Sequence, residues 1–216
     1  MNKLYLLLFI MCINSQTISD NRYIGYDATS MAGSVVANPG TIDGIYNNPS
    51  SIVELKTNSM SFGGGNLYGL SWLPNYYVSF YFKLPIIGSV GFGYQDLSIS
   101  YLNTDLSKEN SLILSNGKYI LNDMNSTLSI GWSINSMSWE TGKSSGVSGD
   151  GSDGIANQEI NVYGVNIGFQ ATLRNTYRMG IFLKNINSPI IGKGLAQQEL
   201  SRRIDVGIAY IPLPDI

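Results

Sequence analysis

The sequence contains no histidine and a single cysteine, Cys12, among its 216 residues. Without histidine, Ser-His-Asp triads, histidine general bases and histidine metal ligands are excluded. A lone cysteine cannot form an intramolecular disulfide. If the chain is exported, its stability must therefore come from backbone pairing and packing.

Charged residues are also scarce, at 13% of the chain, about half the fraction of a typical soluble domain. The net charge of −2 offers no basic surface for nucleic acid. No apolar run of ~18 residues follows the N-terminal segment, which excludes a bundle of transmembrane helices. A hydrophobic content of 44% argues against disorder. Together with 24 glycines and 14 tyrosines, this composition is typical of a membrane β-barrel.

The N-terminus has the pattern of a secretory signal peptide. Lys3 precedes an apolar run over residues 4–11, and polar residues follow from Asn14. This pattern predicts a signal peptide over residues 1–19, with export of the rest. The alternatives are a buried strand and a lipid anchor on Cys12. Met11 disfavours the anchor, because a small residue should precede the lipidated cysteine.

From about Asn58 onward, apolar residues alternate with Gly, Ser, Thr and Asn. A period of two predicts β-strands with one apolar and one polar face. After Tyr94 the apolar residues move to the other face, which predicts a β-bulge or a bend near Asp96. Residues 111–121 are the weakest of the strand candidates. About eight strands are expected, over residues 58–72, 76–84, 90–101, 111–121, 127–135, 163–171, 177–184 and 203–210.

The connections between these strands are expected to differ in length. Residues 74–77 and 83–88 are predicted to be tight turns, and 103–110 and 140–158 longer loops. The Gly/Ser-rich composition of 140–158 predicts a flexible loop. The glycines of 63–65 and 91–93 would let a strand bend or another segment approach closely.

Two architectures fit this pattern: a soluble β-sandwich, with its apolar face against a second sheet, and a transmembrane barrel, with that face against lipid. Long strands and the shortage of Lys and Glu on the polar faces favour the barrel. Aromatic residues near strand ends, such as Trp72, Tyr101 and Tyr177, agree with an interfacial girdle. We therefore expect an all-β protein, an antiparallel transmembrane β-barrel formed by residues 58–216.

Residues 25–55 resemble the N-terminal region of the FadL-like outer-membrane β-barrels, in particular the PorV/PorQ branch. The family's Asn-Pro-Ala-Gly-Leu motif corresponds to Asn48, Pro49, Ser50, Ser51 and Ile52, with the two serines departing from it. YRMGIFLKNINSP and LSRRIDVGIAYIP also look like the PorV-type strand pair.

The resemblance implies that residues 20–57 form a hatch or plug inside the barrel. Asn48 and Pro49 would make a tight turn within that hatch. Family members have about fourteen strands, whereas this sequence holds about eight. A piece of a larger barrel and a small complete barrel both remain open.

No catalytic, cofactor or metal motif is found, so an enzyme is not expected. Asp150 and Asp153 fail the spacing of a calcium loop. Basic residues such as Arg178 and Arg203 either form a solvated rim or contact an anionic group or a partner.

We expect an outer-membrane protein that acts in transport or protein secretion, with lipid, a secretion-system protein or a hydrophobic ligand as partners. The alternatives are an uptake channel for hydrophobic molecules such as fatty acids, and a secreted β-sandwich that binds or adheres.

Overall fold

The computed structural model describes residues 24–101, 104–142, 158–191 and 198–211. The predicted signal peptide, residues 20–23 of the predicted hatch and most of the loop 140–158 lie outside them. In the described part, eight antiparallel strands form one sheet in which each strand pairs with the next. These strands are β1 (Ser59–Asn66), β2 (Pro74–Leu84), β3 (Gly88–Tyr101), β4 (Thr104–Asn122), β5 (Ser126–Thr141), β6 (Gln158–Leu173), β7 (Tyr177–Lys184) and β10 (Arg203–Tyr210).

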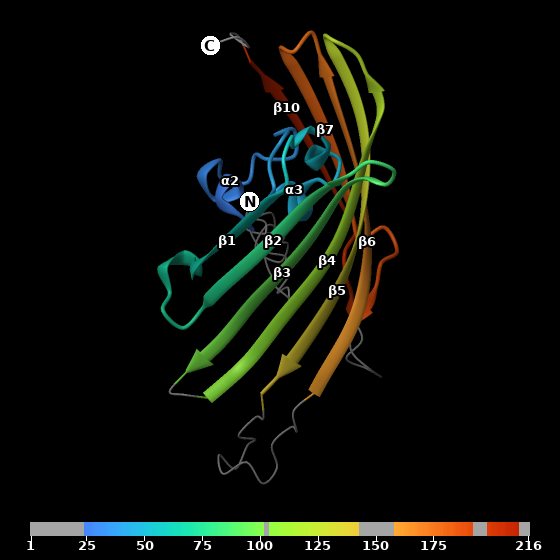
Figure 1. Cartoon of the computed structure of the whole chain (residues 1–216). Coiled ribbons are helices and arrows are strands. Elements are labelled where there is room, and N and C mark those ends of the chain that lie inside the picture. The colour runs from blue at the N-terminus through green and yellow to red at the C-terminus, as the bar shows by residue number, and fades with distance from the viewer. Residues whose placement is uncertain (1–23, 102–103, 143–157, 192–197, 212–216) are drawn as a thin grey trace, which may run out of the picture.

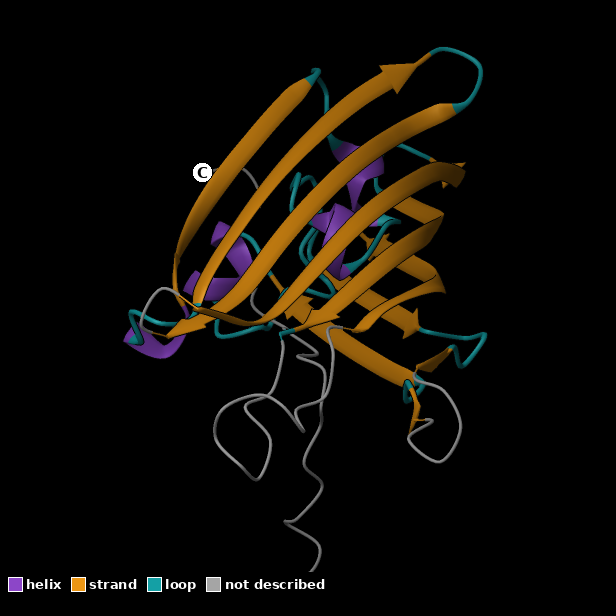
Figure 2. Cartoon of the chain, turned by 90° about the horizontal axis from the view of Figure 1, so that it is seen from below, coloured by secondary structure: helices purple, strands orange, loops and turns teal. Residues whose placement is uncertain are grey.

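The sheet is strongly curved, and short helices of the N-terminal region lie on its concave face (Figures 1 and 2). These are α2 (Tyr26–Ser30), α3 (Gly44–Asn47) and the 3-10 helix η1 (Ser51–Glu54). None of the helices in the described residues is long and apolar enough to span a membrane. Strands β1 and β10 are the two edges. Among the described residues neither edge pairs with a further strand, so the sheet is not closed into a barrel.

The all-β class and the antiparallel meander predicted from the sequence are confirmed. Of the bulge or bend predicted near Asp96, the bulge is wrong: β3 pairs regularly with β4 there, and the irregularity lies between Ile99 and Ser100. Leu97 is buried on the concave face. The apolar residues therefore move from the convex to the concave face although the strand pairing stays regular. An apolar residue is stable there because Ile24 and Ile113 line the same space.

Two predicted connections are also corrected. Residues 104–110 belong to β4, which at 19 residues is the longest strand. Residues 74–77 begin β2 and are not a turn. The turn between β2 and β3 lies where it was predicted, after Leu84. The first strand ends at Asn66, and the next residues form the 3-10 turn η2 (Leu67–Gly69).

The two faces of the sheet differ in composition. The concave face carries mostly Ser, Asn, Gln, Thr and Gly, many of them buried beneath the N-terminal region. The convex face is apolar and exposed, with side chains that include Phe80, Phe82, Phe92, Tyr94, Leu112, Leu114, Trp132, Ile134, Met179, Ile181, Val206 and Ile208. The only other sheet in the described residues is the two-stranded pair β8 (Ile190–Ile191) and β9 (Gln198–Glu199). A sandwich with two packed sheets is therefore not seen in this part of the chain.

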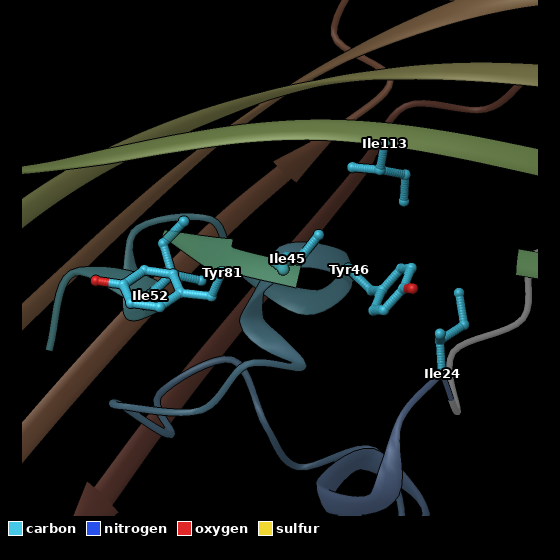
Figure 3. Close-up of a cluster of buried hydrophobic side chains, with 6 residues drawn as sticks. All are labelled: Ile24, Ile45, Tyr46, Ile52, Tyr81 and Ile113. Atoms are coloured by element: carbon cyan, nitrogen blue, oxygen red, sulfur yellow. The ribbon is translucent and has the colours of Figure 1, made fainter. Parts of the chain in front are cut away.

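The main apolar cluster lies between the N-terminal region and the concave face. Its buried members are Ile24, Ile45, Tyr46 and Ile52 from the N-terminal region, with Tyr81 and Ile113 from the sheet (Figure 3). The sheet and the N-terminal region therefore bury each other, because within the described ranges neither has another apolar layer to pack against.

Candidate functional site: the interface between residues 24–57 and the concave face

Residues 24–57, called the N-terminal segment below, occupy the space inside the curve of the sheet (Figure 2). The segment holds three short helices joined by turns, and backbone hydrogen bonds link its parts. The Gly40 N–H donates to the Ser51 carbonyl at 3.1 Å, for example, which ties the middle of the segment to η1. The segment is thus a folded unit rather than an extended strap.

Asn48 lies at the centre of this interface and has no exposed surface. Its Nδ2 donates to the Val36 carbonyl at 2.7 Å and to the Phe169 carbonyl of β6 at 3.4 Å. Its Oδ1 accepts from the backbone N–H and the hydroxyl of Ser50, at 3.2 and 2.7 Å. One side chain therefore joins two parts of the segment to each other and to the sheet.

Pro49 is fully buried against a row of glycines. Gly117, Gly131 and Gly168 are direct partners on β4, β5 and β6, so they lie side by side across the sheet. A Cβ on Gly131 would lie 2.3 Å from the carbonyl carbon of Pro49, and one on Gly168 would lie 2.1 Å from Asn48 Oδ1. Only glycine allows the segment's backbone to approach this closely.

Two further glycines contact the part of the segment around Val36 and Ala37. Gly180 of β7 pairs with Gly207 of β10. A Cβ on Gly180 would lie 2.1 Å from the Val36 carbonyl oxygen, and one on Gly207 would lie 3.0 Å from the Ala37 nitrogen. The segment therefore follows the glycines across the sheet from β4 to β10.

The glycines of β3 contact α3. A Cβ on Gly91 would lie 2.5 Å from Ile45 Cγ1, and one on Gly93 would lie 2.9 Å from the Tyr46 ring. Of the two roles expected for residues 91–93, close approach of another segment is the one observed. Gly65 of β1, by contrast, has open space where a Cβ would be.

Hydroxyl groups fix the segment between the glycines. Ser115 and Ser129 donate to the carbonyls of Ile45 and Ser50, each at 3.1 Å. The Tyr46 hydroxyl donates to the Val78 carbonyl at 2.8 Å and accepts from Ser79 at 3.1 Å. Burial raises the pKa of Tyr46, so this phenol stays protonated and remains a donor.

Asp43 is the buried carboxylate of the segment. Its Oδ2 accepts from the Asp27 N–H at 3.1 Å, and Oδ1 has no partner in the described structure. Gly25, at a φ of 101°, packs directly against this side chain. Burial raises the pKa of Asp43, and the nearby Asp27 carboxylate adds to the shift.

Two hollows adjoin the segment. The first, about 70 Å³, lies between Ile24, Tyr46 and strands β3–β6, with Leu97 and Trp139 in its lining. The second, about 700 Å³, lies between residues 31–39 and β10. The first is well below the ~300–1,000 Å³ of typical small-molecule sites, whereas the second falls within that range.

The sequence directed attention to Asn48 and Pro49, which the structure places at the centre of the interface. It missed the glycine row and the hydroxyl anchors, which were noted only as small residues of a polar face. Their contacts depend on the register between strands. The chain matches no protein-family model, no curated protein and no solved structure with which it was compared.

The glycine row makes a direct prediction for Gly131→Ala. The added methyl overlaps the Pro49 backbone, so we expect the free energy of unfolding to fall by about 1–3 kcal/mol. Hydrogen exchange of residues 44–54 should become faster. Denaturant unfolding and exchange mass spectrometry in detergent measure both. Gly65→Ala is the matched control and should leave both unchanged or slightly improved. Equal effects of the two variants would contradict this account of the interface.

Asn48→Asp tests the amide at the centre. The variant loses the donor to the Val36 and Phe169 carbonyls and buries a charge among acceptors, so we expect a loss of at least about 2 kcal/mol in unfolding free energy. Asn122→Asp is the control, because the Asn122 side chain is exposed at the end of β4. Wild-type stability of Asn48→Asp would show that Asn48 does not hold the segment.

Asp43 predicts a pH dependence. Because its pKa is raised in the folded protein, the folded state binds more protons than the unfolded state between the unfolded value, about 3.9, and the raised value. This carboxyl therefore lowers stability as the pH rises through that window. The unfolding free energy of wild type minus that of Asp43→Asn should fall as the pH rises from 4 to 7. The exposed Asp123→Asn serves as control, and a flat difference for Asp43→Asn would refute the prediction.

Proposed function

We propose that this chain is an outer-membrane protein whose convex face contacts lipid and whose N-terminal segment plugs the concave side. In this proposal it acts, without catalysis, in transport or protein secretion across the outer membrane. The sequence resemblance to the FadL-like family and its PorV/PorQ branch points in the same direction.

The observation that carries the proposal is the exposure of the convex face. Phe92 and Trp132, near the middle of long strands, are 44% and 42% exposed, and Ile208 on β10 is 73% exposed. Exposed apolar side chains occur on all eight strands. Monomeric soluble proteins rarely expose a continuous apolar surface larger than a few hundred Å². A lipid environment would cover this face without any further protein layer.

Strand length supports the same proposal. Strands β3, β4, β5 and β6 have 14, 19, 16 and 16 residues. A tilted strand needs ~9–11 residues to cross a bilayer, whereas strands in soluble sheets usually have ~5–6. These four strands are long enough to cross the hydrocarbon layer and extend beyond it.

The space on the concave side of the sheet distinguishes the two candidate roles, protein secretion and uptake of hydrophobic molecules. The N-terminal segment is fixed by buried hydrogen bonds, and the hollow between it and strands β3–β6 holds only about 70 Å³. A long-chain hydrophobic molecule would need the segment to move before it could enter that hollow. This favours a role in secretion, with the barrel holding a partner, over uptake of hydrophobic molecules.

Single-tryptophan variants test the lipid-facing surface. The chain has three tryptophans. Trp132 points outward from β5, whereas Trp139 lies on the concave side and its Nε1 donates to Ser107 at 2.8 Å. In liposomes with brominated acyl chains, we expect strong quenching of Trp132 in the W72F/W139F variant. Trp139 in W72F/W132F should be quenched much less.

The two variants control for each other, because both keep one tryptophan on the same strand. Equal quenching of both residues, or no quenching of Trp132, would overturn the proposed lipid contact. Protein recovered only in the aqueous fraction would instead favour the secreted β-sandwich.

A further inference from the structure

Three neighbouring side chains on β6 and β7 carry buried polar atoms without hydrogen-bond partners in the described structure. Gln170 and Thr172 are only 2% and 5% exposed. Among the described residues, both amide atoms of Gln170, the Thr172 hydroxyl and the Arg178 Nε are buried without a hydrogen-bond partner. A buried polar group left unpaired loses its hydration without compensation, so native proteins usually satisfy such groups with water or a ligand.

The register brings these side chains together. Thr172 is the direct partner of Arg178, and Gln170 is the partner of Gly180 two residues along. Side chains at alternate positions share one face of a sheet, and direct partners have Cβ atoms ~5 Å apart. All three therefore converge on one region of the concave face, next to the place where Val36 crosses Gly180.

Arg178 also has no ion pair in the described structure. Its charge lowers the pKa of Glu54, while burial of that carboxyl raises it by more. No salt bridge within 4.0 Å joins the two side chains. The second arginine nearby, Arg203, is paired with Asp205 at 2.7 Å. Arg178 is thus a partly buried cation whose hydrogen-bonding capacity is not used by a neighbouring carboxylate.

This arginine opens onto the hollow of about 700 Å³ between residues 31–39 and β10. The hollow is within the size range of small-molecule sites. Its lining also holds Arg203 and Asp205, neutral polar residues such as Asn38, and small or apolar residues such as Val36 and Ala37. A small organic molecule could therefore reach Arg178 from this side.

We propose that Arg178, which lines this hollow, binds the carboxylate of a small organic acid that enters it. A guanidinium has a planar set of N–H donors that matches a carboxylate. Thr172 and Gln170 lie beside Arg178 on the sheet but outside the lining, so they leave its guanidinium without a competing hydrogen bond. The apolar part of the acid would lie against Val36 and Ala37. This inference concerns Arg178 on the concave face and does not rest on the proposed lipid contact.

Propionate and its neutral counterpart propanamide test the inference by isothermal titration of the full chain in detergent, at constant ionic strength. We expect saturable 1:1 binding of propionate in the millimolar range and at least tenfold weaker binding of propanamide. Arg178→Gln should weaken propionate binding at least tenfold, and Arg178→Lys should give an intermediate value. Arg174→Gln, in the exposed turn between β6 and β7, should bind as wild type does.

The Glu54→Gln variant gives a change in propionate affinity that is not expected if Arg178 only stabilises the fold. Removing this carboxylate lowers the repulsion of a bound anion, so propionate should bind more tightly. Hydrogen exchange of residues 44–54 shows whether each variant keeps the segment in place. The inference is overturned if wild type shows no saturable binding, if propanamide binds equally, or if folded Arg178→Gln or Arg178→Lys binds as wild type does.

Discussion

The close contact between the Asn48–Pro49 backbone and three adjacent glycines is the constraint on which the rest of the structure depends. Gly117, Gly131 and Gly168 leave no room for a side chain, so the segment can lie directly on the sheet. Only at that distance can the Asn48 amide reach the Phe169 carbonyl and the Ser129 hydroxyl reach the Ser50 carbonyl. Close packing and hydrogen bonding at this interface therefore depend on each other.

The resulting interior differs from that of an ordinary soluble domain. Its apolar cluster is small, and much of the buried surface is Ser, Asn and Gln. Several of these side chains hydrogen-bond to backbone carbonyls or to one another. Such an interior is stable only when each polar group has a partner, because an unpaired group loses its hydration without compensation. Among the described residues, buried atoms without a partner lie on Asp43, Asn185, Gln170, Thr172 and Arg178, and Arg178 lines the larger of the two hollows.

The sequence predicted the strands and their two faces because period-two alternation is a local property. The same alternation misleads at Asp96, where the position of Leu97 predicts a bulge or a bend. That inference assumed one apolar face per strand, but Leu97 lies on the concave side in a region shared with Ile24 and Ile113. The Asn48–Pro49 turn was also found locally. The glycine row was not, because aligning Gly117, Gly131 and Gly168 requires the register of three strands.

The proposed lipid contact depends on how the backbone groups at the two edges of the sheet are paired. The outer edges of β1 and β10 have no strand partner among the described residues. In water these backbone groups are hydrated, whereas in hydrocarbon each unpaired N–H or C=O costs several kcal/mol. An apolar convex face against lipid therefore requires strand partners for both edges at the same depth. The contacts of Gly180 and Gly207 with Val36 and Ala37 show that the N-terminal segment reaches β10 from the concave side, so it does not take the place of such a partner.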